Sequence, residues 1–181
     1  SKFPAGPTRP LRDLLQDSLD RLNLDSLYGY MAHRAEDLIE KRSLQDELKE
    51  LKSEGKFDKM GCSLYYPQTL QSLWEMGFQP EIIQIPFNVF DQRFQPLLER
   101  IKGAGCEIHV RSVFLQGIFF ANTEELGPFF DTLKTPIRHI QTRFPNMANR
   151  AAQLIRFCLE NPLIDRVVIG VNSARQLNEN V

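Results

Sequence analysis

Residues 56 to 86 read KFDKMGCSLYYPQTLQSLWEMGFQPEIIQIP and contain two predicted strands with a helix between them. Lys56 to Ser63 predicts the first strand, Pro67 to Met76 a helix that begins at proline, and Glu81 to Pro86 the second strand. A parallel neighbour can be reached only through such a crossover connection. The segment therefore predicts an α/β fold built on a parallel sheet.

The same alternation of strand and helix extends in both directions. Before the segment we expect a helix over 9–24, a strand over 26–33 and a helix over 44–52. After it we expect a helix over 93–104, a strand over 106–112, helices over 128–133, 137–141 and 148–160, a strand over 166–171, and a helix opening at 173 or 174. Periodicity does not separate a closed (β/α)8 TIM barrel from an open doubly wound sheet. No Gly-x-Gly-x-x-Gly follows a strand, which favours the barrel.

Composition excludes several classes of protein. The 181 residues are enough for one domain over residues 1–181, and a net charge of -1 without a basic stripe predicts no nucleic-acid partner. No apolar run approaches the roughly 20 residues that span a bilayer, so we expect no membrane partner. Three scattered cysteines and an amino terminus without an apolar core favour the cytoplasm. The strand ends carry no clustered carboxylates or metal ligands, so no metal site is predicted.

Polar residues stand at the predicted carboxyl ends of the strands, where parallel α/β folds carry their function. His33 is either a hydrogen-bond donor to a substrate carbonyl or a structural histidine that caps its strand. Gln84 lies between two isoleucines, so its amide either binds a ligand or pairs within the core. His109 and His139 lie apart from any acidic pair and receive no role.

Two further positions are candidates for binding a phosphate or an aromatic ring. Arg111 would bring a guanidinium to the barrel mouth, where it could stack on a ring or meet a phosphate, or form a salt bridge. Gly170 to Gln176 forms a strand-to-helix turn in which Ser173 would cap the helix. That helix start either attracts a phosphate or is only a capped helix.

Four stretches together resemble the aldo-keto reductase family. LNLDSLYGYMAHR (22–34) is similar to the family's segment that runs into the catalytic histidine, and GKFDKMGCS (55–63) to its next strand. IQIPFN (83–88) is similar to the strand with the cofactor-binding glutamine, and residues 169–180 to the phosphate-binding end. The order and spacing agree over nearly the whole chain. The resemblance implies an incomplete barrel that covers about strands 4 to 8.

The resemblance also implies roles for individual residues. Lys2 and His33 would be two members of a catalytic Asp, Tyr, Lys and His tetrad, whose Asp and Tyr belong to segments that would precede Ser1. The implied cofactor-binding residues are Ser63, Gln84, Arg111, Ser112, Phe114, Gly117, Asn172, Ser173, Gln176 and Asn180. Leu64 departs from the usual Asn, and Arg111 from the usual aromatic residue. Arg175 could bind a 2′-phosphate, so NADP is favoured over NAD, which stays possible.

The implied function is the reduction of an aldehyde, ketone or sugar-like carbonyl by hydride transfer from NAD(P)H, or the reverse reaction. The alternative is a nicotinamide-binding regulatory or scaffold protein of the same fold without turnover. A lyase or isomerase on the same barrel would bring carboxylates or metal ligands to the strand ends, and none is present. The substrate's identity and the oligomeric state are left open.

Overall fold

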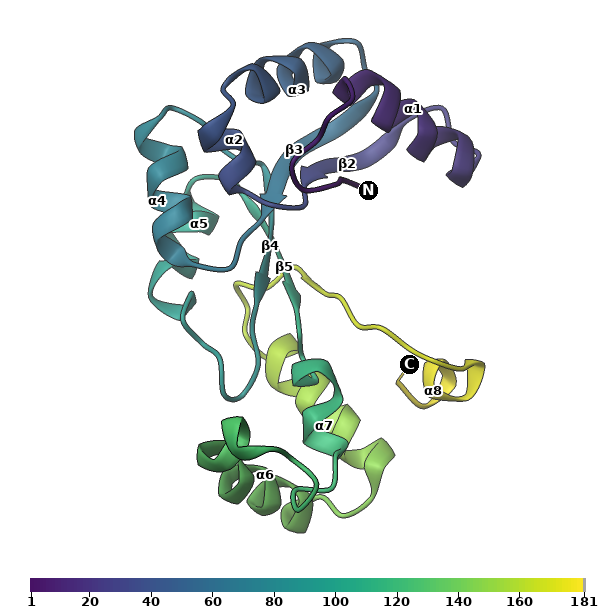
Figure 1. The fold of residues 1–181 in the computed structure, drawn as a ribbon, viewed down its shortest axis with the longest axis vertical. Coiled ribbons are helices and arrows are strands. Elements are labelled where there is room, and N and C mark those ends of the chain that lie inside the picture. Colours follow the sequence, from purple (N-terminus) through teal and green to yellow (C-terminus); the bar gives the residue numbers. More distant parts are fainter. Residues whose placement is uncertain (181) are drawn as a thin grey trace. The chain divides into compact units, whose positions relative to one another are not determined.

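The sheet has its strands in the same order as the sequence. A computed structural model describes residues 1–180, with the side chains of residues 1–178. Within this part the strands are β1 (Lys2–Phe3), β2 (Leu27–Ala32), β3 (Phe57–Ser63), β4 (Ile82–Pro86), β5 (Glu107–Arg111) and β6 (Arg166–Val167), and their order in the sheet is β1-β2-β3-β4-β5-β6. Figure 1 labels β2 to β5. β1 to β4 pair in parallel. Parallel neighbours in sequence order are the arrangement of a (β/α) barrel, and the predicted incomplete barrel is confirmed.

Helices follow most of the strands, as predicted. The described helices are α1 (Leu11–Leu22), α2 (Glu36–Glu40), α3 (Ser43–Ser53), α4 (Pro67–Glu75), α5 (Leu98–Gly103), α6 (Asp131–Arg143), α7 (Met147–Leu159) and α8 (Ala174–Asn180), with short 3₁₀ turns η1 (Gln95–Leu97), η2 (Leu115–Phe120) and η3 (Pro128–Phe130). The expected separation of helices over 128–133 and 137–141 is wrong. α6 continues through Pro136, which lies inside the helix, because a proline can remove one backbone hydrogen bond and kink a helix without ending it.

The chain divides into two compact units. Unit 1 comprises Ser1–Ile85 and Arg93–His109, and unit 2 comprises Pro86–Gln92 and Val110–Val181. Each is described by itself below. The assignment of residues 1–181 to one domain stays a prediction.

The core of unit 1 follows from the apolar spacing of its helices. Leu11, Leu15 and Leu19 recur every four residues in α1, and all three are buried. Four-residue spacing places side chains on one face of a helix, here the face that packs inward. Tyr30 lies in the same core, with its ring centroid 5.6 Å from those of both Phe3 and Phe57.

Two side-chain contacts show that the sheet of unit 1 is strongly curved. The Lys2 Nζ on β1 lies 2.5 Å from the Gln84 Oε1 on β4. In a flat sheet strands three places apart would lie about 14 Å from each other, with parallel side chains that could not meet. Tyr28 on β2 contacts Glu107 on β5 across the same number of strands. The strands therefore curl into an arc whose inner face carries polar side chains, as in a barrel.

Unit 2 packs around the carboxyl-terminal half of β5. The Val168 N donates to the Val110 O at 2.8 Å, immediately after β6. β6 itself spans Arg166–Val167, so the strand expected over 166–171 is shorter than predicted. The Phe87 and Phe157 rings stack with centroids 5.7 Å apart and join the segment after β4 to α7.

Candidate functional site

Lys2, Ser63 and Gln84 gather at the carboxyl end of the sheet in unit 1. Ser63 ends β3 opposite Gln84 in the parallel register, and the Leu64 N donates to the Gln84 O at 2.9 Å. Ser63 and Gln84 are 2% and 7% exposed. The Lys2 ammonium reaches the Gln84 side chain from β1. Sequence reasoning chose these three residues separately, and the fold brings Lys2 into contact with Gln84.

His33 follows β2 at the same end of the sheet. Its backbone N donates to the Phe3 O at 3.1 Å, which continues the pairing of β2 with β1, while its side chain is exposed. An exposed imidazole is accessible to a substrate. Both interpretations of His33, the donor to a substrate carbonyl and the histidine that caps its strand, agree with this exposure.

A cavity in unit 2 collects most of the residues predicted to bind the phosphate end of a cofactor. Its volume is about 530 Å³, within the range of small-molecule sites. Its lining comes from the loop after β5, from α7 and from the segment after β6, and includes the predicted residues Ser112, Phe114, Gly117, Asn172 and Gln176. The predicted residues thus come from two distant parts of the sequence and meet at one site.

The loop after β5 holds an unusual backbone conformation beside this cavity. Ser112, Leu115 and Gln116 have φ values of 60°, 46° and 55°, in the left-handed region that costs energy for residues other than glycine. Gly117 follows with φ 88°. The buried Asn88 donates from Nδ2 to the Ser112 O at 3.0 Å, so the segment after β4 supports this loop. Backbone strain of this kind is concentrated at binding sites.

The start of α8 is capped as the sequence predicts. The Ser173 Oγ accepts from the Gln176 N at 3.2 Å, and the Gln176 Oε1 accepts from the Asn172 N at 2.7 Å. Ser173 therefore caps the start of α8, which is the structural one of its two predicted roles. Arg111 donates to the Ser112 Oγ at 3.2 Å. The side chain of Asn180 lies outside the described residues.

Arg150 is a buried cation next to this cavity that sequence reasoning missed. It is 5% exposed, and its guanidinium donates to the backbone oxygens of Phe119 at 3.1 Å, Phe144 at 2.9 Å and Pro145 at 3.3 Å. Burial lowers the pKa of Arg150. Its neighbour in sequence, Ala151, lines the cavity. The guanidinium also lies 5.8 Å from the Phe120 ring centroid, and a positive charge among backbone carbonyl groups and an aromatic ring favours an anionic ligand nearby.

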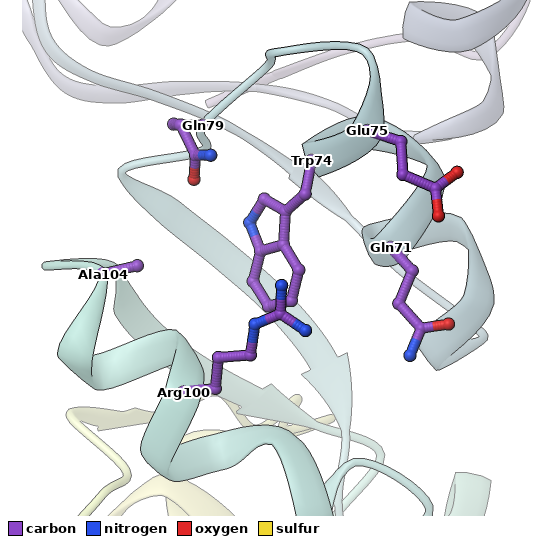
Figure 2. Close-up of a pocket in the computed structure, with 6 residues that line it drawn as sticks. All are labelled: Gln71, Trp74, Glu75, Gln79, Arg100 and Ala104. Atoms are coloured by element: carbon purple, nitrogen blue, oxygen red, sulfur yellow. The ribbon is translucent and has the colours of Figure 1, made fainter.

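A second cavity, of about 590 Å³, lies between α4 and α5 in unit 1. The Arg100 guanidinium lies 4.3 Å from the Trp74 ring centroid. Figure 2 shows this stack with the other lining residues, Gln71, Glu75, Gln79 and Ala104. Trp74 and Glu75 end α4, and Gln79 and Ala104 lie after α4 and α5, in the connections that lead back to the amino ends of β4 and β5. This cavity is therefore at the end of the unit opposite Gln84, away from the end that carries function in such folds.

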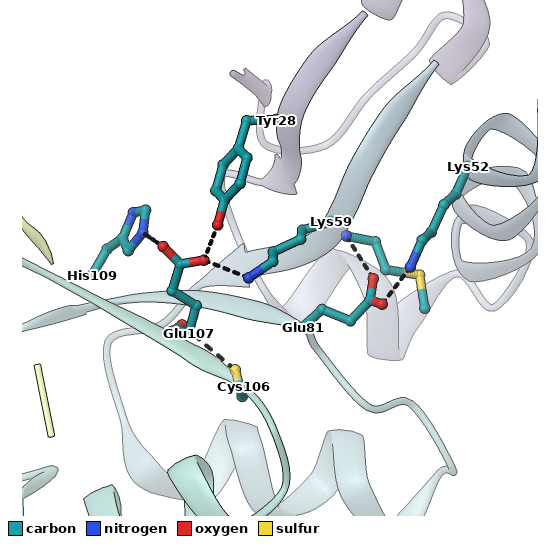
Figure 3. Close-up of polar contacts among 8 residues, drawn as sticks. Tyr28, Lys52, Lys59, Glu81, Cys106, Glu107 and His109 are labelled. Atoms are coloured by element: carbon teal, nitrogen blue, oxygen red, sulfur yellow. Dashed lines mark hydrogen bonds and ion pairs between the residues drawn. The ribbon is translucent and has the colours of Figure 1, made fainter. Parts of the chain in front are cut away.

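Glu107 is the centre of a buried polar group in unit 1 that sequence reasoning also missed. Figure 3 shows Tyr28, Lys59 and His109 pointing at its carboxylate. The Lys59 Nζ lies 2.6 Å from Oε2, which also accepts from the Tyr28 hydroxyl, and the His109 Nε2 lies 2.9 Å from Oε1. The hydrogen bond to Glu107 raises the pKa of Lys59. His109, which received no role in the sequence analysis, is thus adjacent to an acidic residue.

The described residues hold neither a metal-binding cluster nor a helix that could span a membrane. Residues 1–180 hold no group of three or more His, Cys, Asp or Glu side chains placed to bind a metal ion. Within the same range, no helix has both the length and the apolar character needed to cross a bilayer.

Parallel strands in sequence order, an arc with a polar inner face and a lined cavity after β5 together define an incomplete barrel of the TIM class. The family model of the Aldo/keto reductase family matches residues 5–181, and the chain belongs to this family. A search of curated proteins found no match.

Solved structures share this fold at low sequence identity. The aldo-keto reductase AKR11C1 from Bacillus halodurans, in its holo form, superposes with a TM-score of 0.78 and 19% identity over 99% of this chain and 64% of that chain. The glycerol dehydrogenase AKR11B4 from Gluconobacter oxydans has a TM-score of 0.74 and 18% identity over 96% of this chain and 58% of that chain. The chain thus spans about three fifths of the length of these structures.

Proposed function

We propose that this chain carries the nicotinamide cofactor site of an oxidoreductase that reduces an aldehyde, ketone or sugar-like carbonyl by hydride transfer, or catalyses the reverse reaction. One observation carries the proposal. Five of the residues that the family resemblance assigns to the cofactor line a single cavity in unit 2, although the loops that supply them lie more than 50 residues apart in the sequence.

The residues of unit 1 have roles at the reacting end. Ser63 and Gln84 would hold the carboxamide of the nicotinamide, since both are buried at the carboxyl end of the sheet. The bound cofactor would supply the hydride. His33, exposed at the end of β2, would donate a hydrogen bond to the substrate carbonyl, and Lys2 would place a positive charge at the same end of the sheet.

The residues of unit 2 have roles at the phosphate end. Ser112, Phe114, Gly117, Asn172 and Gln176 line the cavity, and the charge of Arg150 behind it favours an anion. Arg111 and Ser173 adjoin this lining, and Asn180 follows in α8. The exposed Arg175 would bind a 2′-phosphate, which makes NADP the proposed cofactor, with NAD the alternative.

Isothermal titration with NADPH and NADH tests the cofactor site. Trp74 stacks on Arg100 at the other end of unit 1, so its fluorescence is a poor reporter of the nicotinamide end. We expect Ala148→Trp, which fills the unit 2 cavity, to weaken binding at least about tenfold, or about 1.4 kcal/mol. Ala152→Trp on the exposed face of α7 is the matched control and should leave the dissociation constant unchanged. Equal affinities for both variants and the wild type would contradict the assignment.

A second candidate function is cofactor binding without turnover. Leu64, which is fully buried beside Ser63, stands where the family usually has Asn, and this removes a polar contact from the nicotinamide end. A screen of aldehydes, ketones and sugars with NADPH separates the two functions. Consumption of NADPH with any of these carbonyls supports the reductase. Tight binding of NADPH that is not consumed with any of them supports cofactor binding without turnover.

A further inference from the structure

The cavity between α4 and α5 in unit 1 contains an arginine whose plane is held while its N–H groups are unused. The Arg100 guanidinium lies 4.3 Å from the Trp74 ring centroid, and Figure 2 shows it in front of the ring. Stacking of this kind fixes the guanidinium plane and leaves the N–H donors, which lie in that plane, pointing outward. Among the described side chains, those of residues 1–178, none forms a hydrogen bond or ion pair with the Arg100 side chain. Because Arg100 lines the cavity, its donors are accessible to a ligand there.

Two glutamine amides flank this stack. Gln71 belongs to α4, Gln79 follows that helix, and Figure 2 shows them on opposite sides of Trp74. Neither amide has a hydrogen-bond partner in the part of the chain that the structure describes. Each offers N–H donors and a carbonyl acceptor. The lining therefore presents a fixed cation and two amide groups to a molecule that enters the cavity.

The charges of the lining limit the kind of anion that fits. Glu75 is the other charged residue of the lining, and among the described contacts it forms no ion pair with Arg100. Because Glu75 repels an anion in proportion to its charge, a ligand with one negative charge is favoured over a phosphate, which carries about two. A carboxylate carries one charge, and its two oxygens match the planar fork of a guanidinium. The cavity volume of about 590 Å³ is in the range of small-molecule sites.

We propose that the cavity between α4 and α5 binds a small organic molecule that carries one carboxylate. The carboxylate accepts hydrogen bonds from both arms of the Arg100 guanidinium, and the amides of Gln71 and Gln79 donate to the ligand on either side. Trp74 holds the guanidinium before the ligand arrives, so binding costs less side-chain entropy than it would at a mobile arginine. The site shares no residue with the proposed cofactor site and does not rest on the proposed function.

Fluorescence of the full chain tests this site directly, because Trp74 is the only tryptophan in the sequence. The probes are acetate, benzoate and 3-phenylpropionate, each compared with its uncharged amide, and inorganic phosphate. We expect at least one carboxylate to change the fluorescence saturably, with a dissociation constant of about 1 mM or below. Its amide and phosphate should each bind at least about tenfold more weakly, because the amide lacks the charge and phosphate is repelled by Glu75.

Two substitutions of Arg100 separate its charge from its shape. Arg100→Gln removes the charge and should weaken binding of the carboxylate at least about tenfold, whereas Arg100→Lys keeps the charge without the planar fork and should weaken it about threefold. Arg156→Gln is the matched control, because it removes the same charge from an exposed arginine of α7, and it should leave the dissociation constant unchanged. Titration calorimetry gives the affinities of the Arg100 variants, because Arg100 contacts the fluorescent ring itself.

Each outcome either supports the site or overturns it. Weaker binding in Arg100→Gln, with the wild-type affinity in Arg156→Gln, supports a carboxylate bound by Arg100. If none of the three carboxylates saturates, or if the amides bind as tightly as the acids, the proposal is overturned and Arg100 only covers the Trp74 ring. Phosphate that binds as tightly as the carboxylates would overturn the proposed class of ligand. Titration with NADPH decides the proposed function separately, since its cavity in unit 2 has a different lining.

Discussion

Two polar groups lie on the inner face of the arc in unit 1, and they differ in how completely their atoms are paired. At the carboxyl end, Gln84 has Lys2 on Oε1 and no partner on Nε2 among the described residues. Towards the amino end, both oxygens of Glu107 accept hydrogen bonds, from Tyr28 and Lys59 on one side and His109 on the other. Each group joins strands that are three places apart in the sheet.

This difference in pairing indicates that Gln84 is available to bind a ligand, whereas Glu107 stabilises the fold. A buried polar group whose donors and acceptors are all paired has no free atom for a ligand. Removing one of its partners strongly destabilises the fold. The Gln84 Nε2 is not among the buried atoms without a partner, so it keeps some exposure and is accessible to a ligand. In barrels of this class the carboxyl ends of the strands carry the chemistry and the amino ends carry stability. We therefore expect substitutions at the two groups to change different measured quantities.

Glu107→Gln should give the largest effect on stability. It removes the charge that pairs with Lys59 and places an NH₂ group among donors, so we expect a loss of about 3 kcal/mol in the free energy of unfolding, measured in urea. Glu124→Gln, which breaks an exposed ion pair with Arg138, is the matched control and should show no measurable change. A loss at Glu107 as small as that at Glu124 would mean that the amino-end group does not support the fold.

Alkaline pH should weaken unit 1 through Lys59 and Tyr30. The hydrogen bond to Glu107 raises the pKa of Lys59 above its ordinary 10.5, and burial raises the pKa of Tyr30 above its ordinary 10.0. Above these ordinary values the unfolded chain releases protons that the folded chain keeps, so the free energy of unfolding falls as pH rises. One such proton contributes at most about 1.4 kcal/mol per pH unit.

Urea midpoints between pH 8 and 11 measure this decline. Tyr30→Phe removes one of the two groups and should make the decline shallower, as should Glu107→Gln, which returns Lys59 towards its ordinary pKa. A decline that is the same in the wild type and in both variants would show that other groups, such as the buried thiol of Cys62, cause it.

Two tyrosines on β2 should respond in opposite directions to the loss of a hydroxyl. Tyr28 donates to Glu107, so Tyr28→Phe should destabilise the fold by about 1 kcal/mol. The Tyr30 hydroxyl is the one buried side-chain N or O atom without a hydrogen-bond partner among the described residues, so Tyr30→Phe should be neutral or stabilise by up to about 1 kcal/mol. The pair is its own control, because both changes remove one oxygen from the same strand. Losses of equal size would contradict the assigned pairing.

The alternation of strands and helices could be read from the sequence because it depends on local spacing. Leu11, Leu15 and Leu19 repeat every four residues, and the strand from Phe57 to Ser63 is bounded by Gly55 and Pro67. The polar strand ends were visible for the same reason, since each one directly follows an apolar run. Contacts between distant elements were not visible. Tyr28 and Glu107 are 79 residues apart, and no local pattern indicates that they meet.

The same limit explains what was missed or misplaced near the candidate site. Arg150 looks like an exposed cation in a helix, and only the fold shows that the carbonyl groups of Phe119, Phe144 and Pro145 surround it. Two helices were expected over 128–133 and 137–141, although a proline inside a helix, here Pro136, can kink it without ending it. The strand expected over 166–171 was too long, because apolar residues alone do not show where pairing with β5 stops.

Lys2→Met should have the smallest effect on stability. Lys2 lies at the edge of the sheet and is partly exposed, so losing its hydrogen bond should cost less than about 1 kcal/mol in urea, well below the loss at Glu107. The same change should nevertheless alter the affinity for the cofactor, because Lys2 places a positive charge at the carboxyl end of the sheet, whereas Tyr30→Phe should leave this affinity unchanged. We assign ligand binding to the carboxyl end of the sheet and stabilisation of the fold to the amino end. A Lys2→Met variant that lost as much stability as Glu107→Gln, with its cofactor affinity unchanged, would contradict this assignment. A small loss of stability with altered cofactor binding would mean that the two groups act independently, although they lie on one face of the same sheet.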